Sequence, residues 1–492
     1  MIFLSILLFI FARSLYHNIS SIFTTRMAAL AFIYAFALTF NALYIQIIGS
    51  GIGIYCGLFQ ITYYSLFIES FIYIVGSMIL LSWGLIYKKS INSNNSLITE
   101  SNIRSSEFNI IKKNEEDLKF IVDSPKPQSN LNYDNLLLLN KNISGISTSS
   151  EARDCSLICL FSSLGSSFLI SSGDLLSMYL SIELQSFGLY ILATIYRESG
   201  SATSAGLKYF LLGGLSSCLI LLGTGLIYAL TGLTDLNSIY SMLSVLSSIS
   251  SENTDSLISN SLDSLYGSYT LAENFNLGLS LGFIFIIVGF LFKVAGAPFH
   301  NWSPDVYDES PSNITIWLTI MPKIAIFLFL FEVYANISLI LPSYDLIELS
   351  QLKTNLITNT SFLTGLALTN ILLLSSFLSL IIGTVVGLAQ IRIKRLFAYS
   401  TISHVGFLLL ALAIKTEQST ESFLFYLIQY TITNLNAFFI LLAFGYIINN
   451  FIKSNYINSD IRNISELKGQ FVSNPILSLS LVISLFSMAG IR

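Results

Sequence analysis

Long apolar runs alternate with shorter polar segments along the 492-residue chain. Most runs approach the length of about 20 residues that a helix needs to cross a bilayer. The pattern predicts an all-α polytopic membrane protein, with a first helix that is short and tilted or partly interfacial. The predicted spans are 1–12, 27–48, 66–87, 155–171, 174–196, 205–230, 277–294, 314–340, 361–389, 396–414 and 422–449, with a further one beginning near 475.

Composition and loop charge support this class. The chain is 53% hydrophobic and 11% charged, against about 25% charged residues in soluble domains. Lysine and arginine collect in alternate loops, whereas the long 231–276 segment is acidic without a basic residue. Because inner loops carry the excess of basic residues, the N-terminus is predicted on the outer side. The four cysteines form no CxxC pair, so no metal or disulfide framework is expected. The chain begins without a basic leader segment, so the first helix is expected to be retained.

Three polar segments separate the spans. Segment 88–154 is rich in Asn, Ser and charge, so we expect a flexible loop on the inner side. The Ser-rich segment 231–276 is expected to hold one short surface helix. Gly49, Gly51 and Gly53 lack the third glycine and the strand–helix context of a nucleotide loop, and are interpreted as a turn between spans.

Lys293 is the most informative residue for chemistry. It ends an apolar run without a nearby counter-charge, and Gly296 and Pro298 interrupt the helix before His300. A lysine at the centre of a span costs about 2.5–3.5 kcal/mol, so it is a functional-site candidate. Broken backbone at membrane depth is tolerated inside protein or beside a water-filled cavity. Lysine and break together predict an ion or proton site.

Glu183 is a second buried charge, with Tyr190 on nearly the same helical face and Lys208 in the next span. A carboxylate about 4 Å from an ammonium favours the charged pair by roughly 4 kcal/mol at an effective dielectric of 20. We therefore predict that Glu183 pairs with Lys208. Two alternatives stay open: Glu183 is satisfied by a hydroxyl group, or Lys208 reaches the surface from the start of its span.

Two further candidates lie later in the chain. Lys323 follows Pro322 within a span, and is either functional or an anchor at a helix end. His404 has hydroxyl neighbours, which suits a proton relay, although a structural histidine is the alternative. The basic cluster that precedes it is most simply an anchor at the inner face: Arg392, Lys394 and Arg395.

Five motifs carry a resemblance: SIELQSFGLYILA, GLKYFLLGGLSS, GFLFKVAGAPFHNWSPDVY, MPKIAIF and IKRLFAYSTISHVGF. In this order and spacing, over about residues 155–490, the chain resembles the antiporter-like membrane subunits of respiratory complex I. The resemblance implies an antiporter-like fold with two inverted five-helix repeats, each with an interrupted helix. The expected organisation is N-terminal helices at 1–87, the polar loop at 88–154, the first repeat at 155–340 and the second at 361–492.

The resemblance also implies residue roles. Glu183 and Lys293 would form the core of a proton half-channel, Lys208 would lie between them, and Lys323 and His404 would continue a central polar axis. The family's second break and the lysine after it are not present, because the sequence reads SMAGIR and stops at Arg492. We therefore expect the second repeat to be truncated and the chain to be incomplete. A separate chain that carries the remainder, or a real loss of half the exit path, are the alternatives.

The implied function is a proton-translocating subunit of NADH:ubiquinone oxidoreductase in the mitochondrial inner membrane, with its N-terminus toward the intermembrane space. NAD, FMN, iron–sulfur clusters and ubiquinone are expected in other subunits, and this chain is expected to hold no cofactor or metal. Expected partners are other membrane-arm subunits and phospholipids, with cardiolipin as a candidate, but no nucleic acid and no small-molecule substrate except protons. The rivals are a component of a multi-subunit cation/proton antiporter and a non-pumping scaffold.

Overall fold

The computed structural model describes residues 1–16, 19–45, 51–83, 154–196, 199–245, 262–340, 360–414, 416–452, 460–488 and 490. The predicted flexible loop 88–154, apart from its last residue, lies outside the described residues. The elements are α1 (Ile2–Leu15), α2 (Ser21–Ala42), β1 (Ile52–Ile54), β2 (Phe59–Ile61), the helices Tyr63–Trp83 and Asp154–Ile170, α5 (Leu175–Thr194), α6 (Gly200–Thr231), a helix at 236–245, α8 (Leu262–Val294), α9 (Trp302–Glu309), α10 (Ser312–Ile340), α11 (Thr360–Leu388), α12 (Ile393–Ile414), α13 (Glu417–Ile452), η4 (Ile464–Leu467), α14 (Gln470–Ser473) and α15 (Pro475–Met488).

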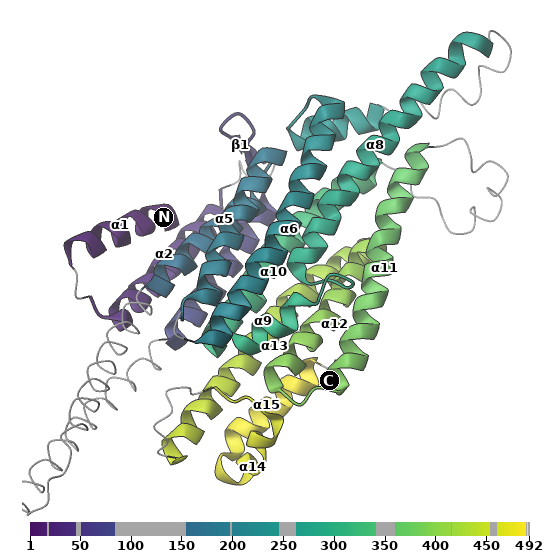
Figure 1. Cartoon of the computed structure of the whole chain (residues 1–492). Helices are drawn as coiled ribbons and strands as arrows, with labels where there is room; N and C mark the ends of the chain where they lie inside the picture. The colour runs from purple at the N-terminus through teal and green to yellow at the C-terminus, as the bar shows by residue number, and fades with distance from the viewer. Residues whose placement is uncertain are drawn as a thin grey trace, which may run out of the picture.

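The long helices run side by side in one bundle (Figure 1), and eight helices of the described part are long and apolar enough to cross a membrane. This confirms the predicted class. Helix α10 lies in the middle and packs against α5, α8, α12 and α13. It is mainly apolar and buried on all sides, as expected for a helix surrounded by other helices. The predicted span 314–340 is therefore the core of the protein.

Two details differ from the predictions. The glycine-rich segment is not only a turn, because Ile52–Ile54 and Phe59–Ile61 pair as an antiparallel hairpin. Helix α8 begins at Leu262 rather than near 277, so the last third of the predicted loop 231–276 belongs to this helix. The short helix expected within 231–276 is present at 236–245. Hydropathy marks only the apolar part of a helix, so it misses polar turns that extend beyond the bilayer.

Small residues let α6 and α8 approach closely. A Cβ placed at Gly223 would come within 2.7 Å of the Gly282 carbonyl oxygen, and one at Gly289 within 3.0 Å of the Ser216 carbonyl oxygen. Helix pairs in membranes associate through such close contacts, because lipid supplies no hydrophobic driving force between them. The packing brings the end of α8 against the polar face of α6.

The connecting segments gather at two ends of the bundle. At one end the Gln60 amide donates to the Ser171 carbonyl and the Leu175 amide to the Thr234 carbonyl, so three predicted outer loops meet. At the other end the Ile393 amide donates to the Arg462 carbonyl, so two predicted inner loops meet. This grouping agrees with the predicted alternation of loops. Which end faces which compartment stays a prediction.

Candidate functional site

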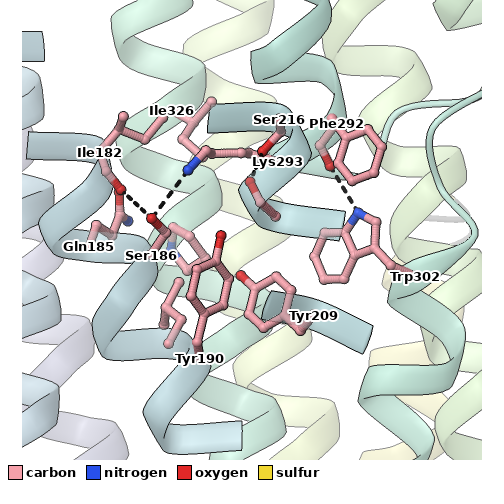
Figure 2. A pocket seen from close by; sticks show the side chains of 13 residues that line it. Ile182, Gln185, Ser186, Tyr190, Tyr209, Ser216, Phe292, Lys293, Trp302 and Ile326 are labelled. Carbon is pink, nitrogen blue, oxygen red and sulfur yellow. Dashed lines mark hydrogen bonds between the residues drawn. The ribbon is translucent and has the colours of Figure 1, made fainter. Parts of the chain in front are cut away.

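The helix break after Lys293 is fixed by hydrogen bonds. Ala295 has a φ of +65°, which turns the chain out of α8, and the Gly296 amide donates to the Leu291 carbonyl at 2.9 Å. The indole nitrogen of Trp302, the first residue of α9, donates to the Phe292 carbonyl at 2.9 Å (Figure 2). The last carbonyls of a helix lack partners within the helix. Here the Gly296 amide and the Trp302 indole donate hydrogen bonds to two of these carbonyls, and this holds the end of α8 in place.

Lys293 forms a buried ion pair with Glu183. Its Nζ lies 3.2 Å from Oε1 of Glu183, and the two side chains are 6% and 14% exposed. The same ammonium donates to Ser186 Oγ at 3.2 Å and to Ser217 Oγ at 3.3 Å. An ammonium has three donors, and all three find partners here. Lys293 also lies in the last turn of α8, where the helix dipole favours a positive charge.

A small cavity lies beside Lys293 and is lined by residues of α5, α6, α8, α9 and α10 (Figure 2). Tyr190 lines it, as its position relative to Glu183 suggested. Gln185 also lines it, and neither amide atom of this side chain, which is 2% exposed, has a hydrogen-bond partner in the described structure. Pro322 and Ile326 of α10 form part of the wall. The wall is mostly apolar, with Gln185, Ser186 and Lys293 among its polar groups, and it reaches from Lys293 to the helix that carries the next lysine.

Lys323 lies near the middle of α10 and is only 2% exposed. Its Nζ donates to the Tyr430 hydroxyl at 3.3 Å and lies 5.8 Å from the ring centres of both Tyr307 and Tyr430. Within the described ranges no carboxylate lies within 4 Å of it. Aromatic faces within about 6 Å stabilise an ammonium. Burial rules out the alternative that this lysine anchors a helix end.

His404 lies on α12 next to the same tyrosine. Its Nδ1 is 2.6 Å from the Tyr426 hydroxyl, and its ring centre is 5.5 Å from that of Tyr430. The structure therefore brings Lys323 and His404 together around Tyr430. Across the described ranges, no group of His, Cys, Asp and Glu side chains could hold a metal ion.

The predicted pairing of Glu183 with Lys208 is wrong. Lys208 Nζ lies 3.0 Å from Asp305 and 3.9 Å from Glu309, and its side chain is 44% exposed. It precedes Ser217 on α6 by about two and a half turns, so it points away from the face that meets Lys293. The alternative of a lysine that reaches the surface from the start of its span is the one observed.

The basic cluster at the start of α12 is more than an inner-face anchor. Arg392 and Arg395 both pair with Asp308 of α9, which holds α9 across the end of the bundle. Lys394 is buried and pairs with Asp460 at 2.7 Å. Burial alone would raise the pKa of the Asp460 carboxyl. The charge and hydrogen bond of Lys394, together with hydrogen bonds from Ser312, outweigh burial, so that pKa lies below its ordinary value.

Four residues that form hydrogen bonds at the two lysine sites were not among the predicted site residues. They are Ser186, Ser217, Tyr426 and Tyr430. Ser186 follows Glu183 by three residues and so shares its helical face, a spacing that the sequence does offer. The tyrosines carry no such signal, because aromatic residues are common throughout apolar spans.

Bundle and site together define a class, namely a polytopic helical membrane protein with buried ionisable side chains that contact one another across helices. The sequence profile described as "NADH:quinone oxidoreductase/Mrp antiporter, TM" matches residues 172–367 and 337–491. The chain belongs to this family.

Its relatives agree with this assignment. The chain is 45% identical, over all 492 residues and 76% of the relative, to NADH-ubiquinone oxidoreductase chain 2 of Rhizopus oryzae. It is 33% identical to the protein of the same name in Oenothera berteroana, over 69% of this chain and 58% of that one. The fold is similar to that of a chain in respiratory complex I from Thermus thermophilus with bound aureothin, with a TM-score of 0.59, 22% identity, and coverage of 100% and 78%.

Proposed function

We propose that the chain is a proton-translocating membrane-arm subunit of NADH:ubiquinone oxidoreductase in the mitochondrial inner membrane, with its N-terminus toward the intermembrane space. Glu183, Lys293, Lys323 and His404 carry the protons, and Lys208 has only a surface role. NAD, FMN, iron–sulfur clusters and ubiquinone belong to other subunits. The names of the relatives and the family support this proposal, and the buried Glu183–Lys293 ion pair is the observation that carries it.

The energy of this pair suits proton movement against a membrane potential. At 3.2 Å, and with an effective dielectric of about 20, two unit charges attract by about 5 kcal/mol. Moving one proton against 100 mV takes about 2.3 kcal/mol. The attraction within the pair is therefore larger than this cost. A change in the neighbouring subunits that separates the pair would release a proton from Lys293, and one that joins the pair would bind a proton there. In this proposal the proton then moves toward Lys323 along the cavity, whose wall includes Pro322 and Ile326 of α10.

The test is proton translocation in the assembled complex. Lys293→Met and Glu183→Gln should each lower the proton flux that accompanies NADH oxidation, while native gels show the complex assembled. Full proton flux in an assembled Lys293→Met complex would refute the role of this lysine. If every variant shows the same proton flux as the parent complex, the protons do not pass through this chain. The chain would then be a scaffold instead.

One rival keeps direct support, because the family includes Mrp antiporters. In that case the same buried charges would exchange a cation for protons in a small multi-subunit complex. Purification of the native assembly separates the two functions. Co-purifying NADH:ubiquinone reductase activity supports the proposal, whereas a small complex with cation/proton exchange and no reductase activity supports the rival.

A further inference from the structure

We propose that the Tyr430 hydroxyl relays protons between Lys323 and His404. The inference rests on the proposed function, since it adds a residue to that proton path. Lys323, Tyr430 and His404 lie on three different helices, α10, α13 and α12, so only the folded bundle brings them together.

The contact with Lys323 is specific to one hydroxyl. Lys323 is buried. Among the described residues, its Nζ forms one hydrogen bond, which is to the Tyr430 hydroxyl oxygen at 3.3 Å. A buried ammonium without a carboxylate must give up or receive its proton through the polar group that touches it. Tyr430 is that group, and its side chain is itself buried.

The ring of Tyr430 also lies beside the imidazole of His404. The ring centres of His404 and Tyr430 are 5.5 Å apart, and His404 Nδ1 is held by the Tyr426 hydroxyl at 2.6 Å. Tyr426 and Tyr430 are four residues apart on α13, so their side chains share one face of that helix. When Nδ1–H donates to Tyr426, Nε2 keeps the lone pair that accepts a proton.

The step conserves charge and leaves the tyrosine neutral. The Lys323 ammonium passes one proton to the Tyr430 oxygen, while the hydroxyl proton of Tyr430 passes on to His404 Nε2, directly or through one water. Lys323 ends as a neutral amine and His404 as an imidazolium. The reverse step restores the start, with Tyr430 again a neutral phenol.

Tyr307 supplies a matched control. Its ring centre lies 5.8 Å from Lys323 Nζ, the same distance as that of Tyr430, but its hydroxyl has no hydrogen-bond partner within the described structure. Tyr430→Phe and Tyr307→Phe both keep a ring beside the ammonium and remove one oxygen. Only the first removes a hydroxyl that Lys323 contacts.

The experiment compares Tyr430→Phe, Tyr307→Phe and Lys323→Met in the assembled complex. Proton flux, NADH oxidation and the amount of complex on native gels are measured for each. We expect Tyr430→Phe to lose as much proton flux as Lys323→Met, and Tyr307→Phe to match the parent, with all three assembled to the parental amount.

Other outcomes overturn the inference in separable ways. Parental flux in Tyr430→Phe, with flux lost in Lys323→Met, refutes the relay and leaves the proposed function intact. Parental flux in Lys323→Met refutes the path through Lys323 itself. Equal losses in Tyr307→Phe and Tyr430→Phe, or a loss of assembly confined to Tyr430→Phe, indicate that the tyrosine acts through packing and not as a relay.

Discussion

Replacing both members of the Glu183–Lys293 pair should restore the stability that replacing one of them destroys. The perturbation is a cycle of three variants, Glu183→Gln, Lys293→Met and the two combined. Removing one partner of a buried ion pair leaves an uncompensated charge and typically destabilises by about 3–5 kcal/mol. Replacing both partners is often neutral or stabilising, because neither charge then has to leave water.

The contacts of this pair favour such a result. The side chains are 6% and 14% exposed, so solvent screens the charges little. The two serines around Lys293 do not lose their only partner, because Ser186 Oγ also donates to the Ile182 carbonyl at 2.8 Å and Ser217 Oγ to the Gly213 carbonyl at 3.0 Å. The double variant therefore leaves few polar groups unsatisfied, apart from the new glutamine amide beside the cavity.

The assay follows two quantities. The half-life of the assembled complex at raised temperature reports stability as a rate, which is appropriate for a large assembly that unfolds irreversibly. Proton flux per NADH oxidised reports function. We expect short half-lives for the single variants, a half-life near the parent for the double variant, and reduced flux in all three. A double variant as labile as the singles, or one that pumps normally, would contradict the reasoning.

Two further predictions concern other parts of the bundle. Lys208→Met should change stability by no more than about 1 kcal/mol, because the ion pairs of Lys208 are exposed. Its proton flux should stay near that of the parent, and a flux as low as that of Lys293→Met would contradict the geometry. Gly223→Ala should destabilise by about 1–3 kcal/mol, because its Cβ would meet an α8 carbonyl at 2.7 Å. A Cβ at Gly225 would meet no atom within 4 Å, so Gly225→Ala should be neutral or slightly stabilising. The half-life assay compares the two glycine variants.

The class of protein and the approximate position of each span followed from the sequence, because the requirement for about 20 apolar residues is local in the chain. The choice of Lys293 as a functional-site candidate also came from the sequence, because a lysine beside a helix break is costly to bury in any membrane fold. The extra helical turns of α8 and the hairpin at Ile52–Ile54 did not follow, because they lie where hydropathy gives no signal.

The tertiary structure alone decided which charges meet. The sequence offered Lys208 and Lys293 as partners for Glu183, and helix rotation selected Lys293 by turning Lys208 to the surface. The same holds for Tyr307 and Tyr430, which are indistinguishable as residue types, although only one hydroxyl contacts Lys323. Hydrophobicity is a property of each segment, whereas a contact between helices depends on their rotation, depth and neighbours. The sequence therefore determined which residues were costly to bury, and the packing of the helices determined what each of them touches.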